Sequence, residues 1–224
     1  MTTPKALIVD YGGVLTSPLG SAMDNWFATD GIDQDSFRDT MRDWLGLSES
    51  APTDPPTARS VSPIHALERG DVAADEFERQ LAERLRTVTG DPVVAEGLLM
   101  RMFAGYSGAA PSPLIEAVRR VKAAGFATAL LSNSWGMDYP REAWPDLFDV
   151  VVISGEVRMR KPEPEIYQLT LDQLGLVGAD CVFVDDLRPN VRAAVDLGVI
   201  GIEHVSAAAT LAELERLFGL SLSD

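Results

Sequence analysis

The sequence contains little cysteine, little histidine and relatively few cations. Its 224 residues include one cysteine and two histidines, and 34 acidic against 19 basic residues give a net charge of −15. The lone Cys181 cannot form an internal disulfide, so we expect a thiol in a reducing compartment. The negative charge repels nucleic acids and anionic lipid, so any anionic ligand must be captured by local cations.

Long apolar runs are also absent from the sequence. No stretch approaches the roughly 18 apolar residues that span a bilayer, and no apolar N-terminal segment precedes a cleavage site. We therefore expect a cytoplasmic protein without a membrane partner. The length and the 46% hydrophobic content allow a sizeable core, either as one domain or as one domain carrying an insertion.

Short apolar runs rich in β-branched residues recur along the chain and predict buried strands. They lie at 6–9, 126–131, 150–153, 181–184 and 199–202. Their hydrophobicity is continuous rather than alternating, which suits strands buried on both faces of a parallel sheet. Helical patterns accompany the later runs at 112–124, 138–148, 163–175 and 187–197. This alternation predicts an α/β fold with a Rossmann-like, doubly wound parallel sheet.

A long interval without a buried strand follows the first run. It contains helical patterns at 19–29, 34–46, 73–89 and 91–104, and a loop rich in proline and serine at 48–63. We predict an all-helical cap domain at 16–106, inserted into a core domain formed by 1–15 and 107–224. Small residues and prolines at 16–18 and 105–112 are candidate hinges for closure of the cap.

Asp10 is the first candidate functional residue. It follows the first apolar run and precedes Gly12 and Gly13, and such a carboxylate at a strand end, beside a turn that lets a ligand approach the backbone, is placed for chemistry. An isolated Asp in this position is more often a cap or a turn residue. Three further segments favour the active-site interpretation.

The further segments follow the second, third and fourth runs. Ser132 and Asn133 can donate hydrogen bonds to an anion or cap a helix, and Lys161 lies just before a predicted helix start. Asp185 and Asp186 are adjacent carboxylates, which repel each other unless a cation lies between them. Mg²⁺ is the hard cation most often held by a few carboxylates, water and a phosphate.

Taken in order, these segments resemble the haloacid dehalogenase superfamily of hydrolases. The resemblance rests on Asp-x-x-Gly-x-Leu at 10–15, on Ser132, on Lys161-Pro162-x-x-x-x-Tyr167 and on Asp185-Asp186-x-x-x-Asn190. The helical insertion and the segment 160–167 resemble the subgroup with a small helical cap. That subgroup includes the phosphatase domain of soluble epoxide hydrolases and small sugar-phosphate phosphatases.

The resemblance implies a magnesium-dependent phosphatase of a small phosphorylated metabolite. The sequence leaves open whether the protein is a monomer or a homodimer. Asp10 would be the nucleophile and form an aspartyl-phosphate. Asn190 would position its loop. Mg²⁺ would be bound by Asp10, the Gly12 carbonyl and an acid of the fourth segment, Asp186 with Asp185 in support. Catalysis would involve Asp10, Ser132 and Lys161, and the substrate would be bound by Gly12, Gly13, Asn133 and Lys161.

One position departs from the pattern of the superfamily. Most of its phosphatases carry a second aspartate two residues after the nucleophile, as the acid that protonates the leaving group, but this chain has Gly12. The contribution of the acid, typically 10²–10⁴-fold, must come from elsewhere or be absent. Tyr11, Glu156 and His65 are candidate replacements, and a good leaving group in an acyl, anomeric or aryl phosphate would reduce the need.

Two alternatives follow from the same residues. A dehalogenase would use Asp10 to attack carbon and would need no Mg²⁺, which leaves the acidic pair at 185–186 without a purpose. A protein without the general acid could instead be a non-catalytic phosphate-ligand-binding protein. Trp135, three residues after Ser132, is a candidate for the mouth of the pocket under each interpretation.

Overall fold

The computed structural model describes residues 3–16, 19–45, 62–104, 112–136, 139–144 and 146–222. Its centre is one five-stranded sheet in the order β3-β2-β1-β4-β5, with every neighbouring pair parallel. The strands are β1 (Ala6–Val9), β2 (Ala127–Ser132), β3 (Val150–Ile153), β4 (Cys181–Asp185) and β5 (Ile200–Glu203). This confirms the predicted parallel sheet of an α/β fold, with strand bounds within one residue of the apolar runs.

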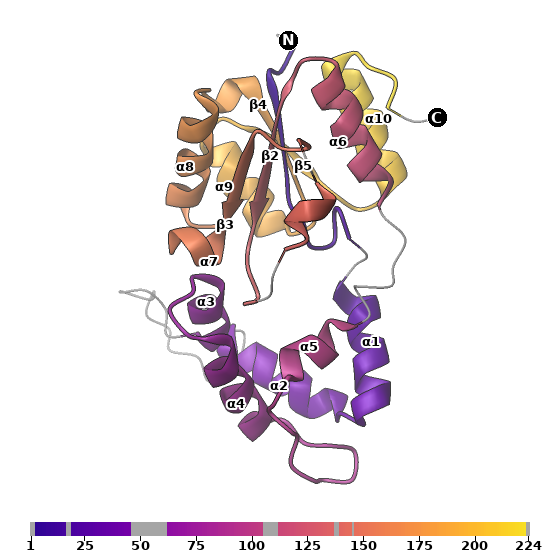
Figure 1. Cartoon of the computed structure of the whole chain (residues 1–224), viewed down its shortest axis with the longest axis vertical. Helices are drawn as coiled ribbons and strands as arrows, with labels where there is room; N and C mark the ends of the chain where they lie inside the picture. The colour runs from indigo at the N-terminus through magenta and orange to yellow at the C-terminus, as the bar shows by residue number, and fades with distance from the viewer. Residues whose placement is uncertain are drawn as a thin grey trace.

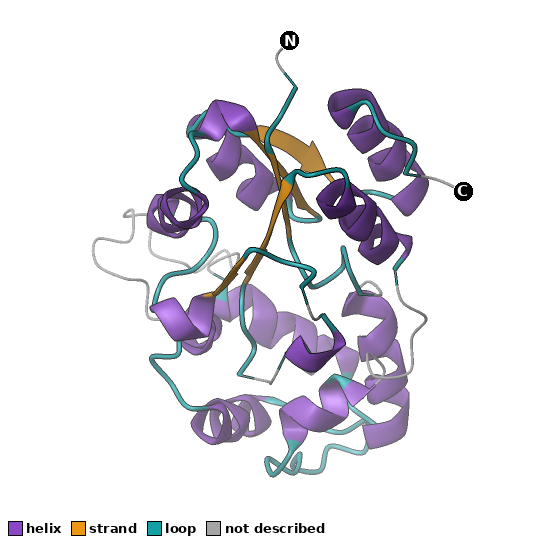
Figure 2. Cartoon of the chain, turned by 45° about the horizontal axis from the view of Figure 1, so that its top comes forward, coloured by secondary structure: helices purple, strands orange, loops and turns teal. Residues whose placement is uncertain are grey.

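Helices cover both faces of the sheet (Figures 1 and 2). One face packs against α6 (Pro113–Ala123) and α10 (Ala207–Phe218), and the other against α8 (Pro164–Leu174) and α9 (Arg188–Asp196). A short helix, α7 (Ser154–Val157), follows β3 directly. Only an unbroken apolar sequence can supply side chains to two buried faces, which explains the continuous hydrophobicity of the runs.

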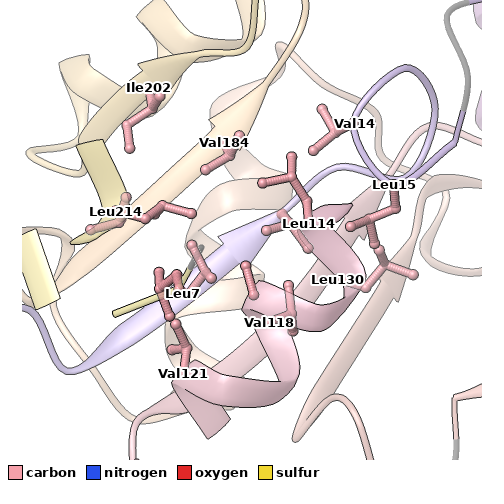
Figure 3. Close-up of a cluster of buried hydrophobic side chains, with 14 of the residues drawn as sticks. Leu7, Val14, Leu15, Leu114, Val118, Val121, Leu130, Val184, Ile202 and Leu214 are labelled. Atoms are coloured by element: carbon pink, nitrogen blue, oxygen red, sulfur yellow. The ribbon is translucent and has the colours of Figure 1, made fainter. Parts of the chain in front are cut away.

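Successive residues of each strand point to opposite faces of the sheet. Leu7 of β1 joins the cluster under α6 and α10, where Figure 3 shows it beside Val118 and Val121, while Ile8 joins the cluster under α8 and α9. Cys181 lies in the second cluster and is fully buried. Burial and the neighbouring Asp180 raise the pKa of this thiol to about 11, so it is a core residue and not a nucleophile.

The first five of the six described α-helices between β1 and β2 form a separate layer, which we call the helical layer. The sixth, α6, packs on the sheet. The helices of the layer are α1 (Leu19–Asp30), α2 (Gln34–Trp44), α3 (Pro63–Glu68), α4 (Ala74–Arg84) and α5 (Leu98–Met102). These helices surround a third apolar cluster that includes Trp26, Phe77 and Met102. Figure 1 shows the layer below the sheet, on the side to which the carboxyl ends of the strands point.

Some predicted helices were wrong in extent or in kind. Among its described residues, the segment 138–148 contains only a 3-10 helix at Arg141–Ala143, and Asp146 has a left-handed φ of 59° that a continuous helix does not allow. The predicted helix at 91–104 is reduced to α5, since Pro92 instead forms an isolated bridge with Arg86. Helix α4 ends at Arg84, where the chain turns extended.

Three of the described α-helices had not been predicted, namely α3, α7 and α10. Helix α3 begins at Pro63, the last residue of the predicted loop at 48–63, and Ser62 accepts a hydrogen bond from the His65 N–H as its N-cap. The rest of that loop and most of both candidate hinges lie outside the described residues. No helix in the described part of the chain has the length and apolar character to cross a membrane.

Shortening a core side chain of the central strand should destabilise the protein. Leu7→Ala removes apolar contacts in β1, where Leu7 is fully buried, so its free energy of unfolding should fall by about 2–5 kcal/mol. Val205→Ala, at a site 76% exposed, should change it by less than about 0.5 kcal/mol. Urea unfolding followed by circular dichroism measures both, and equal effects of the two substitutions would contradict the proposed core.

Candidate active site

Three carboxylates meet at the carboxyl ends of the two central strands. Strands β1 and β4 are paired in register from Ala6 with Cys181 to Val9 with Val184, so the residues that follow them are neighbours. The Asp10 N–H donates to the Val184 carbonyl at 2.9 Å. Carboxylate oxygens of Asp10, Asp185 and Asp186 all lie within 4.8 Å of one another, as the sequence pattern led us to expect.

Gly13 allows the backbone after β1 to lie directly against the Asp186 carboxylate. Its φ is 74°, in the left-handed region, and a Cβ built there would lie 2.4 Å from an Asp186 carboxylate oxygen. The Gly13 N–H donates to the Thr16 hydroxyl at 3.1 Å. Gly13, predicted to bind substrate, therefore lies against Asp186 and is absent from the described lining of the cavity at this site.

Lys161 is buried between two of the carboxylates, with 1% of the residue exposed. Its Nζ lies 2.7 Å from an Asp10 oxygen and 2.6 Å from an Asp185 oxygen, and it donates to the Leu131 carbonyl at 2.9 Å. The three ammonium protons thus have three acceptors. Burial alone would lower the pKa of Lys161, but Asp10 and Asp185 outweigh it and raise this pKa, so the side chain stays charged.

The two acids of the fourth segment have different environments. Asp185 is fully buried and accepts hydrogen bonds from Lys161, from the Leu187 N–H at 2.8 Å and from the Asn190 side chain at 3.0 Å. Asp186 is half-buried, and its carboxylate accepts no hydrogen bond from another described residue. Asp185 is thus committed to holding Lys161, and Asp186 is free to bind a ligand.

The electrostatics of the group favour a divalent cation. Burial raises the pKa of Asp10 to about 7; Lys161 opposes this shift and Asp185 adds to it. Three carboxylates against one ammonium leave two negative charges unbalanced when all the acids are ionised. The available donors are oxygens, which suits Mg²⁺ rather than a metal that prefers nitrogen or sulfur.

Asn133 and Ser132 follow β2, next to the carboxylates. The Asn133 side chain accepts from the Lys161 N–H at 2.8 Å and donates to the Lys161 carbonyl at 3.0 Å, so it fixes the lysine backbone. The Ser132 hydroxyl forms a 2.9 Å hydrogen bond with the Tyr139 hydroxyl. Tyr139, which we had not predicted at the site, also donates to the Asn133 carbonyl at 3.2 Å.

A cavity of about 160 Å³ opens beside Asp10. The sheet side contributes residues from the predicted segments, together with Tyr139 and Leu187, and the helical layer contributes Glu68 and Phe103. Trp135 lines the cavity, as expected. Glu68, Phe103 and Tyr139 belong to no local motif, and Leu187 occupies an unspecified position of the fourth segment; only the folded chain brings them together.

The three candidates for the missing acid are placed differently. Tyr11 lines the cavity, whereas His65 and Glu156 are not among its described lining residues. Burial, with Arg160 and Arg69 nearby, lowers the pKa of His65 to about 4. Glu156 forms an ion pair with Arg141, and both side chains are more than half exposed. Tyr11 is therefore the one of the three that the geometry keeps at the site.

The helical layer touches the core beside the cavity. The Glu68 side chain at the end of α3 pairs with Arg160, and the Glu68 carbonyl accepts from the Ser154 hydroxyl. The next residue, Arg69, is 4% exposed and lies 2.7 Å from Glu163. These buried contacts hold the end of α3, and with it Glu68, against the wall of the site.

Replacing Lys161 should destabilise the fold strongly. Lys161→Met leaves Asp10 and Asp185 buried without their counter-ion, which should cost about 3–5 kcal/mol at neutral pH. Lys5→Met removes an ion pair with Asp180 in which the lysine side chain is 63% exposed, and should cost at most about 1 kcal/mol. Denaturant unfolding of both variants with a chelator present provides the test, and a Lys161→Met effect as small as that of Lys5→Met would refute it.

Asp10→Asn should stabilise the metal-free protein, but only at higher pH. The pKa of Asp10 is 3.8 as a free side chain and about 7 in the fold, so its contribution to stability is present below about pH 4 and is lost as pH rises through 7. Asparagine cannot ionise, so the gain should be absent near pH 4 and reach roughly 2 kcal/mol or more above pH 7. Unfolding in chelator at both ends of this range measures it, and a gain independent of pH would count against it.

We compared the chain with protein families and with known proteins of similar sequence. A family model for haloacid dehalogenase-like hydrolases matches residues 4–198. The sesquiterpene phosphatase astK of Aspergillus oryzae is 31% identical over 158 residues, which cover 68% of this chain and 78% of that protein. Bifunctional epoxide hydrolase 2 of Rattus norvegicus is 33% identical over 115 residues, 48% of this chain, and the match spans about a fifth (21%) of that longer protein.

Solved structures share the fold. A HAD family enzyme of Bacteroides thetaiotaomicron, determined in complex with magnesium and inorganic phosphate, superimposes with a TM-score of 0.61 at 18% identity. The match covers 89% of this chain and 93% of that one. The family model matches most of the chain, and the parallel sheet carries the sequence segments in the expected order. The chain therefore belongs to the haloacid dehalogenase-like hydrolases.

Proposed function

We propose that this hydrolase is a magnesium-dependent phosphatase that cleaves a small phosphate monoester through an aspartyl-phosphate on Asp10. The observation that carries the proposal is the pairing of Asp10 with buried Lys161 beside a cavity and two further carboxylates. Two comparisons support it, a relative named as a phosphatase and a structural neighbour in complex with magnesium and phosphate. The helical layer within 16–106 would act as the cap domain.

The residues present fit Mg²⁺. We propose that Asp10, Asp186 and the Gly12 carbonyl bind it, and that Asp185 supports the site by holding Lys161. Asp186 is the better ligand of the acidic pair because its carboxylate is not occupied by other residues, whereas both oxygens of Asp185 are. The bound cation would neutralise charge on the phosphoryl oxygens.

The chemistry would proceed in two displacements at phosphorus. An Asp10 oxygen forms a bond to phosphorus while the bond to the leaving oxygen breaks, and the leaving oxygen takes the electron pair and then a proton. Water next attacks the phosphorus of the aspartyl-phosphate, which releases inorganic phosphate and restores the carboxylate. Lys161 orients Asp10, and Lys161 and the Ser132 hydroxyl would bind phosphoryl oxygens.

Gly12 brings no acid to the first displacement. Tyr11 lines the cavity, and burial raises the pKa of its hydroxyl, which makes it a weaker proton donor than an ordinary tyrosine. The enzyme would therefore depend on a leaving oxygen that tolerates the negative charge. Good leaving groups should react much faster than simple alcohols.

The proposed function predicts release of phosphate that depends on both Mg²⁺ and Asp10. Acetyl phosphate, a reactive acyl phosphate, should be hydrolysed with Mg²⁺ and not with excess chelator. Asp10→Asn should abolish hydrolysis, and Asp186→Asn should lower kcat/KM by about 100-fold through loss of a ligand. Acid quenching during turnover should trap a phosphorylated peptide containing Asp10, detected by mass spectrometry.

Asp180→Asn is the matched control. It removes a carboxylate at the opposite end of β4, where Asp180 pairs with Lys5, and should leave the rate unchanged. Hydrolysis that persists in Asp10→Asn would reject the covalent mechanism. Chloride release from a 2-chloro acid without metal would indicate a dehalogenase, and Mg²⁺-dependent phosphate binding without turnover would indicate a binding protein.

A further inference from the structure

The wall of the cavity is largely aromatic. Tyr11 and Tyr139 contact each other with ring centroids 5.2 Å apart, and Phe103 and Trp135 do so at 5.6 Å. The first pair comes from the segments after β1 and β2, and the second joins the end of α5 to the loop after β2. Leu187, 56% exposed, adds an apolar side chain to the same lining. Such rings pack well on a flat apolar ligand.

Most polar groups of the wall are occupied by the protein itself. Asn133 is bonded to the Lys161 backbone, Glu68 to Arg160, and the Ser132 and Tyr139 hydroxyls to each other. Among the described lining residues, the uncharged side-chain groups left without a hydrogen bond are the Tyr11 hydroxyl, the Trp135 indole N–H and the side-chain carbonyl of Asn190. A site for a polyhydroxylated leaving group needs several polar groups directed at its hydroxyls. This wall offers few.

The charges of the wall argue against a second anionic group on the ligand. Lys161 is the one cationic side chain among the described lining residues, and it already pairs with Asp10 and Asp185. Glu68 is the one acid of the described lining outside the proposed metal site, and its partner Arg160 is not among the described lining residues. A nucleotide or a carboxylated ester would bring further negative charge here without a partner, whereas an uncharged ring would not.

The chemistry of the leaving oxygen points the same way. A phenol-type oxygen releases its proton near pH 10, as tyrosine does, so it departs as an anion far more readily than a sugar hydroxyl. An enzyme with Gly12 in place of an acid gains most from such a group. Of the three reactive classes, acyl, anomeric and aryl phosphates, the aryl class alone also matches the aromatic wall.

Resting on the phosphatase function above, we propose that the cavity between Asp10 and the Phe103–Trp135 pair selects phosphate monoesters of uncharged aromatic hydroxyl compounds. The ring lies against Tyr11, Trp135 and Leu187 while the phosphoryl group reaches Asp10. Glu68, held by Arg160, excludes anionic substituents from the wall.

Binding of two phosphonates tests the wall separately from reactivity, because their carbon–phosphorus bond is not hydrolysed. With Mg²⁺ present, calorimetry should show phenylphosphonate binding at least about tenfold more tightly than methylphosphonate. Leu187→Ser should reduce this ratio by roughly threefold or more, since Leu187 is exposed and its loss costs the fold little. Val177→Ser, at a valine that is 64% exposed and outside the described lining, should leave the ratio unchanged.

The outcomes separate this inference from the proposed function. Hydrolysis of acetyl phosphate together with equal affinities for the two phosphonates would overturn the aromatic selection and leave the phosphatase standing. Preferential binding of phenylphosphonate without turnover of acetyl or phenyl phosphate would overturn the phosphatase and retain the aromatic selection. Binding of neither phosphonate, together with no turnover of acetyl or phenyl phosphate, would overturn both. A higher kcat/KM for glucose 1-phosphate than for phenyl phosphate would also contradict the inference.

Discussion

The ion pairs of one buried lysine organise this protein. Lys161 has almost no solvent contact, and its ammonium bonds to Asp10 after β1, to Asp185 at the end of β4 and to the Leu131 carbonyl in β2. These three strands are neighbours in the middle of the sheet, so a single side chain contacts the carboxyl ends of all three. A buried ammonium is stable only with such partners, and each buried carboxylate needs the lysine in return. Asp10, Asp185 and Lys161 are therefore one electrostatic unit, in which a change in the charge of Asp10 or Lys161 shifts the pKa of the other.

That unit also assigns different tasks to neighbouring residues of the same chemical type. Asp185 uses both oxygens within the protein, and Asp186, one residue later, keeps its carboxylate available because Gly13 leaves room beside it. Asn133 is likewise an internal residue, since its amide bonds to both peptide groups of Lys161. The chain thus surrounds a charge-unbalanced cluster with fixed groups and leaves Asp10 and Asp186 as the acids of the cluster that line the cavity. Preorganisation of this kind costs stability, which is why removal of the Asp10 charge should stabilise the metal-free fold at high pH.

The sequence predicted the sheet and the central cluster because both follow from local signals. Apolar runs of β-branched residues mark the strands, and polar residues directly after Val9, Leu131 and Val184 must meet when those strands are parallel neighbours. The prediction of a helix at 138–148 was wrong because the apolar pattern was given more weight than the two prolines in that stretch of sequence, Pro140 and Pro145. Tyr139, Glu68 and Phe103 had no comparable signal. Their places depend on how a 3-10 segment and the helical layer pack against the core, which is decided by contacts between residues far apart in the chain.

The residues that the sequence predicted and those that it did not would have different tasks under the proposed function. The groups that would act on phosphorus stand at strand ends, where backbone pairing fixes them, while the groups that would meet the leaving group come from the wall. Trp135 shows how the two are joined, because it belongs to the core segment after β2 and yet its ring packs against Phe77 and Phe103 of the helical layer. A shift of that layer would move Phe103 and, through it, the ring of Trp135, whereas the ion pairs of Lys161 lie within the core. Under the proposed function, substitutions in the layer could therefore change selectivity while the ion pairs of Lys161 are kept.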